Sequence, residues 1–320
     1  MIEITRTMTV LVCTHNRAKL LLRTLYYLNM ALRPQGWQID ILVLVNACKD
    51  NTLDSLFQFH EQTPDGLPLS WVEEPTPGKS HALNRAIPLI ASDLVTFVDD
   101  DHRVDEDYLA NVCNATENYP EAGLFCGRIL PDWDDSEPAW VHDSGPYRIY
   151  PLPVPQFDQG DLPRRLTPEI AIPGGGNLFL RSKWLRRVGP FSTDLGPIGH
   201  NLGGAEDLDW ILRAQQLGAL LQYIPSVIQY HYVEVDRLTL SYLMKKAYTR
   251  SASTIGLTNK PNNEHVPLYL YRKLGTYLFF ALTSLHTDRR RFYLVRTAAA
   301  LGEIKGYRQC MDACKTTNDS

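Results

Sequence analysis

Apolar and polar positions alternate along the first hundred residues in a way that predicts strands and helices in turn. Four short apolar runs have the length of buried strands, at residues 8–13, 39–45, 69–72 and 94–98. The segments between them carry apolar residues at helical spacing, around residues 20–28, 53–57 and 80–90. Because strand and helix alternate, we expect right-handed crossovers and a parallel sheet.

Polar turns follow three of these strands and begin at Thr14, Asn46 and Asp99. The carboxyl ends of parallel strands lie at one edge of a sheet, and open α/β sheets bind their ligands at that edge. We therefore expect the three turns to gather at a single ligand-binding edge.

The pattern is less regular in the second part of the chain. Residues 132–168 are rich in proline, acidic and aromatic side chains, and they predict a long functional loop. A recognisable pattern resumes at residues 174–180, which predict a glycine-rich turn and a strand. A helix is then predicted to begin near Glu206. Two further strands are predicted as a pair, at residues 219–223 and 227–231.

The C-terminal part combines an apolar helical face with basic flanks. Six apolar side chains share that face: Leu270, Leu274, Tyr277, Leu278, Ala281 and Leu285. Residues 266–308 contain eight Lys and Arg against two acidic residues, a net charge of +6. Such a helix can lie in a membrane interface or pack on the protein's own core, and the sequence leaves both interpretations open.

Composition narrows the function classes. The 320 residues carry a formal net charge of -4, so the part outside residues 266–308 carries -10, which argues against a nucleic-acid-binding protein. With 44% hydrophobic residues the chain can bury a substantial core in one large domain or two smaller ones.

Cysteine usage and the terminus favour a cytoplasmic protein. Six scattered cysteines without a CxxC pair argue against a zinc site and favour a reducing compartment. The amino terminus lacks the pattern of a secretory signal, and no stretch reaches the ~18 apolar residues of a spanning helix.

Three consecutive carboxylates, Asp99, Asp100 and Asp101, follow the strand at residues 94–98. Like charges so close together cost free energy unless a cation or an ordered hydrogen-bond network compensates. Carboxylate oxygens suit a hard divalent ion such as Mg²⁺ or Mn²⁺, which also takes substrate phosphates. A solvated acidic loop is the alternative, but the position at a strand's carboxyl end favours the metal site.

Two other motifs fit poorly. Residues 77–80 (PGKS) resemble the end of a P-loop, but the first glycine that a P-loop requires is Glu73 here. The acidic triplet differs from the DDxxD motif of helical prenyl-diphosphate enzymes, because Arg103 occupies the last acidic position and the flanks are strand-like.

Five segments, taken in order, resemble the family 2 glycosyltransferases of the GT-A fold. They are residues 10–17 (VLVCTHNR), 78–84 (GKSHALN), 98–101 (VDDD), 174–177 (GGGN) and 205–207 (AED). Each motif alone is weak to moderate, but the ordered set is specific. The resemblance covers about residues 8–235.

The resemblance implies an α/β fold with three parts. These are a Rossmann-like nucleotide-sugar-binding half at residues 1–105, an acceptor-binding and catalytic half at 106–235, and a C-terminal helical region at 236–320. The first two together would form the GT-A domain, residues 1–235. The helical region contains the basic, apolar helix described above, for which membrane association and packing on the core are both left open.

The resemblance also implies roles for particular residues. Asp101 would bind the divalent cation (Mn²⁺ or Mg²⁺) directly. Asp99 would be a second residue of the metal site, in contact with the ribose or metal-bound water, and His231 would add a further metal contact. Because a lone histidine beside tyrosines is often structural, that second interpretation of His231 stays open. The nucleotide sugar would be contacted by Thr14, Asn16, Arg17, Asn46, Lys79, Asn84, Asp99 and Asp100.

The catalytic residues implied are two acids at the start of a helix. Asp207 would act as general base toward the acceptor hydroxyl, and Glu206 would orient the acceptor or the base. Acids also favour a helix start electrostatically, so this position alone does not require catalysis. The acceptor would be contacted by Gly175, Gly176 and Asn177; a flexible loop is the alternative there.

One position departs from the family pattern. Asn46 occurs where the family usually has an aspartate that contacts the base, so a UDP-sugar is the first expectation and a GDP-sugar the second. No QxxRW sequence follows Asp207, and its absence favours transfer of a single sugar.

The sequence therefore predicts an inverting, metal-dependent glycosyltransferase of polysaccharide or glycolipid biosynthesis. Its partners would be a nucleotide sugar and a glycan or lipid-linked acceptor, at the inner face of the cytoplasmic membrane; the oligomeric state is left open. A sugar-phosphate nucleotidyltransferase is one alternative, although the turn after the first strand lacks that class's glycine-rich basic signature. A non-catalytic nucleotide-sugar-binding protein is the other, and the intact acids at Asp99, Asp101 and Asp207 count against it.

Overall fold

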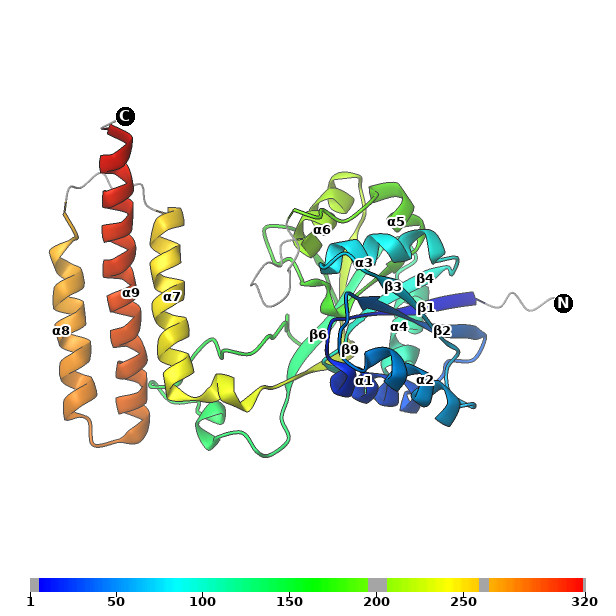
Figure 1. Cartoon of the computed structure of the whole chain (residues 1–320), viewed down its shortest axis with the longest axis horizontal. Helices are drawn as coiled ribbons and strands as arrows, with labels where there is room; N and C mark the ends of the chain where they lie inside the picture. Colours follow the sequence, from blue (N-terminus) through cyan, green and yellow to red (C-terminus); the bar gives the residue numbers. More distant parts are fainter. Residues whose placement is uncertain (1–5, 195–205, 259–264, 319–320) are drawn as a thin grey trace. The chain divides into compact units, whose positions relative to one another are not determined.

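A computed structural model of the chain describes residues 6–194, 206–258 and 265–318 (Figure 1). The chain divides into two compact units. The first comprises Met1–Asp132 and Pro155–Tyr232, and the second comprises Trp133–Val154 and Val233–Ser320. Part of the loop predicted from the proline-rich composition thus groups with the C-terminal helices, whereas the sequence assigns all of it to the domain before residue 235.

The amino-terminal half of the first unit consists of four parallel strands and the helices between them. The strands lie in the order β3-β2-β1-β4. Their bounds are β1 (Arg6–Thr14), β2 (Trp37–Asn46), β3 (Leu69–Glu74) and β4 (Leu94–Asp99). The helices are α1 (Ala18–Met30), α2 (Thr52–Gln62) and α3 (Lys79–Ala86), followed by the short 3-10 helix η1 (Ile87–Leu89). The parallel arrangement predicted from the alternating pattern is present here.

Beyond β4 the sheet becomes mixed. A short antiparallel strand joins the parallel half to the remaining strands, in the order β4-β8-β6-β9-β5, with β7 paired to β9. The strands are β5 (His102–Val104), β6 (Leu124–Asp132), β7 (Arg164–Leu166), β8 (Leu178–Arg181) and β9 (Leu221–Tyr232). The helices are α4 (Tyr108–Asn118), α5 (Lys183–Val188) and α6 (Glu206–Gln216), together with the 3-10 helix η3 (Gly175–Asn177).

Helices cover both faces of this sheet and build two hydrophobic cores. Val10 and Val12 of β1 belong to the core beneath α1, α2 and α4, while Leu11 belongs to the core beneath α3, α5 and α6. Since successive side chains of a strand point to opposite faces, a strand buried on both faces must be apolar throughout. This explains the continuous apolar runs of the sequence.

The two strands predicted at residues 219–223 and 227–231 form one strand, β9. Its partner β6 pairs Cys126 with Tyr223 and Arg128 with Ile228, so β9 advances five residues while β6 advances two. The extra residues, which include Pro225, are accommodated as an irregularity of a continuous strand. The prediction of a pair was wrong because a proline within an apolar run was interpreted as a turn.

The second unit is mainly helical. Its main helices are α7 (Leu240–Thr258), α8 (Leu268–Thr283) and α9 (Thr287–Asn318), with the 3-10 helices η2 (Ala139–His142) and η4 (Val235–Leu238). Helix α9 lies between α7 and α8 (Figure 1). Val141, Val154, Val233 and Leu238 form a small core beside them. Among the described residues, no helix is both long enough and apolar enough to cross a membrane.

The predicted apolar face of residues 270–285 divides in the structure. Leu270 and Ala281 are buried, and Tyr277 contacts Tyr293 of α9 with ring centroids 6.0 Å apart. By contrast, Leu278 is 43% exposed and Leu285 is 97% exposed. One side of α8 therefore packs on α9, and the other side leaves apolar side chains uncovered.

Candidate active site

A cavity of about 260 Å³ lies where β1, β2 and β4 end. The three turns expected at one sheet edge meet there, because Cys13 pairs with Asp99 and Thr14 with Val45 in the parallel register. The cavity is lined by Cys13, Thr14, His15, Arg17, Asn46, Pro77, Gly78, Lys79, Asp99, Asp100, Asp101 and His231. Most of the predicted nucleotide-contacting residues belong to this set.

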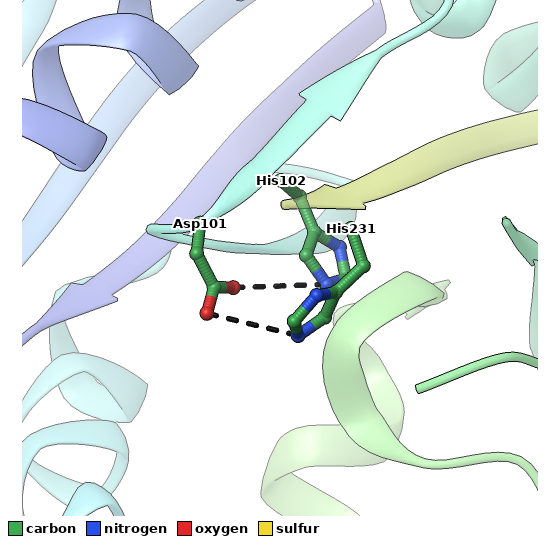
Figure 2. A group of neighbouring side chains, drawn as sticks. All are labelled: Asp101, His102 and His231. Carbon is green, nitrogen blue, oxygen red and sulfur yellow. Dashed lines mark ion pairs between the residues drawn. The ribbon is translucent and has the colours of Figure 1, made fainter. Parts of the chain in front are cut away.

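One carboxylate and two imidazoles converge at one side of the cavity (Figure 2). Oxygens of Asp101 lie 3.8 Å from Nε2 of His102 and 3.7 Å from Nε2 of His231. The antiparallel pairing of β5 with β9 sets His102 directly opposite His231. This pairing brings together two side chains that are far apart in the sequence.

Both imidazoles are oriented by hydrogen bonds on their far side. Nδ1 of His102 faces the side-chain oxygen of Gln229, and Nδ1 of His231 lies 2.6 Å from the carbonyl oxygen of Tyr232. Because both partners are acceptors, each Nδ1 donates a hydrogen bond, and each Nε2 points toward Asp101. Burial lowers the pKa of His231 and so favours the neutral form that a metal needs.

This donor set fits a divalent cation. Two imidazole nitrogens and a carboxylate oxygen within 4.8 Å of one another suit a divalent first-row transition ion better than Mg²⁺, which takes oxygen ligands. Hydrogen bonds behind metal-ligating histidines are the usual support of such sites. Asp99, predicted as a second metal contact, is not one of the three converging residues.

Arg17 compensates two of the three consecutive carboxylates. Its guanidinium donates to Asp101 at 2.7 Å and to Asp100 at 3.2 Å. Burial and the neighbouring Asp101 nevertheless raise the pKa of Asp100 to about 6. The charge repulsion expected from the sequence is thus relieved partly by Arg17 and partly by the raised pKa of the Asp100 carboxyl group.

Lys79 joins the third carboxylate to the predicted base. Its Nζ lies 2.9 Å from Asp99 and 3.9 Å from Asp207. Burial alone would lower the pKa of Lys79, but the two carboxylates raise it well above its ordinary value. Burial alone would raise the pKa of Asp99, but Lys79 and His102 hold it well below its usual range. Lys79 is therefore a fixed positive charge at the start of α3.

The glycine-rich turn packs directly on two of these acids. The backbone N–H of Gly175 donates to Asp207 at 2.9 Å. A Cβ atom on Gly175 would lie 2.3 Å from the Asp207 carboxyl carbon, and one on Gly176 would lie 2.7 Å from Oδ2 of Asp99. Both glycines are needed because the turn and the acids approach too closely for a side chain.

Asn177 lies beneath the site rather than at its surface. Its amide nitrogen donates to the carbonyls of Arg128 and Val227, and its oxygen accepts from Tyr108 and Gln229. The side chain is buried, and its hydrogen-bonding capacity is used within the protein. The structure therefore gives Asn177 a supporting position, where the sequence predicts an acceptor contact.

Three other asparagines also bond mainly to the protein. Asn46 donates to the carbonyls of Glu74 and Thr76 and accepts from the N–H of Gly78, so it shapes the turn before α3. Asn84 lies outside the cavity lining and bonds twice to the backbone of Phe191. Asn16 is exposed and is also absent from the lining.

The two acids at the start of α6 have different environments. Asp207 accepts the Gly175 bond and lies near Lys79, whereas Glu206 is buried, with Oε2 lacking a hydrogen-bond partner among the described residues. Burial, followed by the neighbouring Asp207, raises the pKa of Glu206. The alanine and glycines that precede Glu206 lie outside the described residues.

The sequence interpretation missed three residues of the site. His15 lines the cavity, His102 belongs to the converging set, and Gln229 orients His102. The sequence around His102 and Gln229 does not indicate that they belong to one site. Only the pairing of β5 with β9 shows that residues 102 and 229–231 lie together. Cys13 also lines the cavity, but burial raises the pKa of its thiol to about 12, so it stays protonated.

Comparisons with known proteins agree with this geometry. The family model described as glycosyl transferase family 2 matches residues 9–189, more than half of the chain. A search of curated protein sequences returned no match.

Several solved structures are similar in fold. A mannosyltransferase from Pyrobaculum calidifontis, PcManGT in complex with GDP-Man and Mn²⁺, is 19% identical with a TM-score of 0.51, covering 98% of this chain and 79% of its own. S. aureus TarS 1-349 in complex with UDP-GlcNAc is 16% identical with a TM-score of 0.55, covering 97% and 92%. GalNAc-T7 with UDP, GalNAc and Mn²⁺ is 14% identical with a TM-score of 0.53, covering 78% and 51%. At these identities the likeness establishes the GT-A fold alone.

Proposed function

This chain belongs to glycosyl transferase family 2, and from that premise we propose that it transfers a single sugar from a nucleotide diphosphate to an acceptor hydroxyl, with inversion. One observation carries the proposal. A lysine at the sheet edge lies between Asp99 of the nucleotide-side cavity and Asp207, the candidate base. The diphosphate leaving group and the carboxylate that accepts the proton would thus both lie near the Lys79 ammonium group.

The cation would be held by Asp101, His102 and His231. A bound Mn²⁺ would neutralise charge that develops on the leaving diphosphate. The similar structures that contain GDP-Man or UDP together with Mn²⁺ support a divalent cation and a nucleotide-sugar donor. Lys79 would add a second positive charge for the diphosphate, since it lies in the cavity lining with a raised pKa.

Asp207 would take the proton of the acceptor hydroxyl. As the acceptor oxygen forms its bond to the anomeric carbon, the bond to the diphosphate oxygen breaks on the opposite side, which inverts the configuration. The Gly175 N–H holds Asp207 through Oδ2, and this fixes the carboxylate in one orientation.

The nucleobase of the donor sugar nucleotide is less constrained by the structure than the cation and the general base. Both donor amide hydrogens of Asn46 are used by backbone carbonyls, so its Oδ1 is the atom that could accept a further bond. Uracil and guanine both offer a ring N–H to such an acceptor. We retain a UDP-sugar as the first expectation and a GDP-sugar as the second.

The test separates donor binding from transfer. Asp207→Asn should retain binding of the donor with Mn²⁺ but lose transfer by about 10²–10⁴-fold, because the general base is gone. The measurement is calorimetric donor affinity together with sugar transfer to a panel of glycan and lipid-linked acceptors.

The matched control is Asp209→Asn, which lies on the same helix and pairs with Arg213. Asp209→Asn should transfer at the rate of the unaltered protein. Normal turnover of Asp207→Asn would overturn the base assignment. Release of diphosphate from a nucleoside triphosphate and a sugar phosphate would instead identify a nucleotidyltransferase.

We also propose that α8 brings the protein to an anionic membrane surface. Its outer side exposes Phe279 by 60% and Leu282 by 73%. The helix contains no acidic residue and carries Arg272, while Lys273 pairs with Glu303 of α9. An apolar face beside basic residues suits the boundary between headgroups and acyl chains. This surface supports a lipid-linked acceptor and a peripheral position on the inner membrane face.

A further inference from the structure

A second pocket lies wholly within the C-terminal unit. It is open to solvent, has a volume of about 220 Å³, and is formed by residues 148–153, α7 and α9. Four of its lining side chains are basic: Arg148, Lys246, Arg250 and Arg296. None of the lining residues is acidic.

Among the described residues, three of the basic side chains of this pocket lack the carboxylate partners that other basic residues of the unit have. Within the described residues, Arg148, Lys246 and Arg296 form no ion pair with a carboxylate. Elsewhere in the same unit such pairs are formed by Arg237 with Glu234, Lys273 with Glu303, and Arg291 with Asp143. These three side chains therefore place positive charge at the pocket that no described carboxylate neutralises in an ion pair.

Lys246 is held at this pocket although its environment disfavours its charge. Its Nζ donates to the carbonyl oxygen of Pro153 at 3.2 Å. Burial, followed by the nearby Arg237 and Arg250, lowers the pKa of Lys246. An anion in the pocket would relieve this repulsion.

Aromatic rings hold two of the guanidinium groups. The Arg296 guanidinium lies 5.0 Å from the centroid of the Phe292 ring, and that of Arg148 lies 5.4 Å from the centroid of the Tyr150 ring. Stacking on a ring leaves the N–H edges of a guanidinium available to donate. The rest of the wall is apolar and consists of Leu152, Pro153, Leu243, Val295 and Ala299.

We propose that this pocket binds a phosphoryl group carried on an apolar chain. Arginine forks match the oxygens of a phosphate or diphosphate, and three arginines line this pocket. The basic side chains of the lining suit the phosphoryl headgroup. The apolar wall then receives the first part of the chain. The inference stands on the C-terminal unit alone and does not depend on the transfer reaction.

The test uses three probes with the full-length protein. These are inorganic diphosphate, farnesyl phosphate, and phosphatidylcholine vesicles containing phosphatidic acid. Binding is measured by calorimetry or co-sedimentation in the presence of EDTA, which suppresses metal-bridged binding at the nucleotide cavity. The pocket variant is Arg148→Gln with Arg296→Gln, at two exposed residues without carboxylate partners among the described residues.

A matched control removes the same charge elsewhere. Lys245→Gln with Arg186→Gln changes two exposed residues outside the pocket lining. A second pocket variant, Ala299→Glu, introduces a carboxylate into the lining and should act in the same direction. Melting curves establish that each variant is folded.

Farnesyl phosphate should bind at least about tenfold more weakly to both pocket variants, because charge-assisted hydrogen bonds to the phosphoryl oxygens are lost or opposed. The control variant should bind like the unaltered protein. If the pocket variants also lose diphosphate binding, the proposal is supported and the phosphoryl group is the main determinant of binding. If they lose only vesicle binding, the proposal is supported and the phosphoryl group is that of a lipid headgroup. Unchanged binding by the pocket variants, or no binding of any probe, would overturn the proposal.

Discussion

At the scale of single residues, the histidines of the candidate metal site depend on the groups behind them. Gln229 is buried, and its amide nitrogen donates to the carbonyl of Phe97, to the Tyr108 hydroxyl and to Asn177. These bonds fix the amide orientation, so its oxygen must face His102. The tautomer of His102 therefore follows from contacts made on several separate strands and helices of the first unit.

Gln229→Leu should weaken Mn²⁺ binding by about 10–100-fold, because the acceptor that orients His102 is removed. The matched control is Gln222→Leu on the same strand, since Gln222 is also buried but forms no side-chain hydrogen bond among the described residues. Mn²⁺ affinity is measured by electron paramagnetic resonance of free ion. Equal affinities of the two variants would contradict the orienting role.

Glu206 gives a pH dependence whose sign follows from its raised pKa. A carboxyl group with a higher pKa in the folded than in the unfolded chain stabilises the fold below its unfolded pKa, and this contribution is lost as pH rises through the folded pKa. Glu206→Gln should therefore lose less stability than the unaltered protein as pH rises from about 4, the unfolded pKa, through the raised folded pKa. Urea unfolding across this range is the measurement, with the exposed Glu121→Gln as the control. Parallel stability curves for Glu206→Gln and the unaltered protein would refute the prediction.

At the scale of elements, the turn formed by η3 determines where two acids can lie. Gly175 and Gly176 touch Asp207 and Asp99, whereas a Cβ on the preceding Gly174 would meet nothing within 4 Å. The three adjacent glycines therefore look alike in the sequence but have different roles. Only the first tolerates a side chain.

Gly175→Ala should displace the Asp207 carboxylate and reduce transfer by about 10²-fold, since a misplacement near 1 Å can cost that much. Gly174→Ala should leave transfer nearly unchanged. Initial rates at saturating donor are the measurement, together with melting temperatures to detect loss of folding. If both alanines had the same effect, close packing against Asp207 would not be the reason for the glycine.

The same elements explain how far the sequence could be interpreted. The parallel half was predictable because each apolar run ends in a polar turn, and register then brings Thr14, Asn46 and Asp99 to one edge. The mixed half was not, because Pro225 within β9 has the local signal of a turn. Asn177 and Asn84 gave no sign of their internal bonds, since an asparagine that supports a loop and one that faces a ligand have the same sequence context.

At the scale of the whole molecule, the two units differ in what their surfaces offer. The first unit encloses its acids in a cavity, and the second exposes cations and apolar side chains. The sequence pattern predicted a helix over residues 270–285 but did not separate its inner from its outer side. Contacts of Tyr277 and Phe280 with Tyr293 identify the side of α8 that packs on α9.

Phe279→Glu with Leu282→Glu should abolish co-sedimentation with vesicles of anionic lipid, because both exposed side chains would become charged and repelled. The control is Leu162→Glu, which makes the same change at a leucine exposed by 71% in the first unit. Analytical ultracentrifugation is run in parallel. Retained vesicle binding with a change from oligomer to monomer would show that this face joins copies of the chain instead.

The cross-strand pairing of residue 102 with residue 231 also has a consequence for biosynthesis of the protein. The carboxylates at 99–101 leave the ribosome well over a hundred residues before the histidine that faces them. A nascent chain that ends before β9 contains every acid of the triplet but only half of the imidazole pair. An unfinished chain therefore lacks the complete candidate cation site, which forms only when β9 has been synthesised and has joined the sheet.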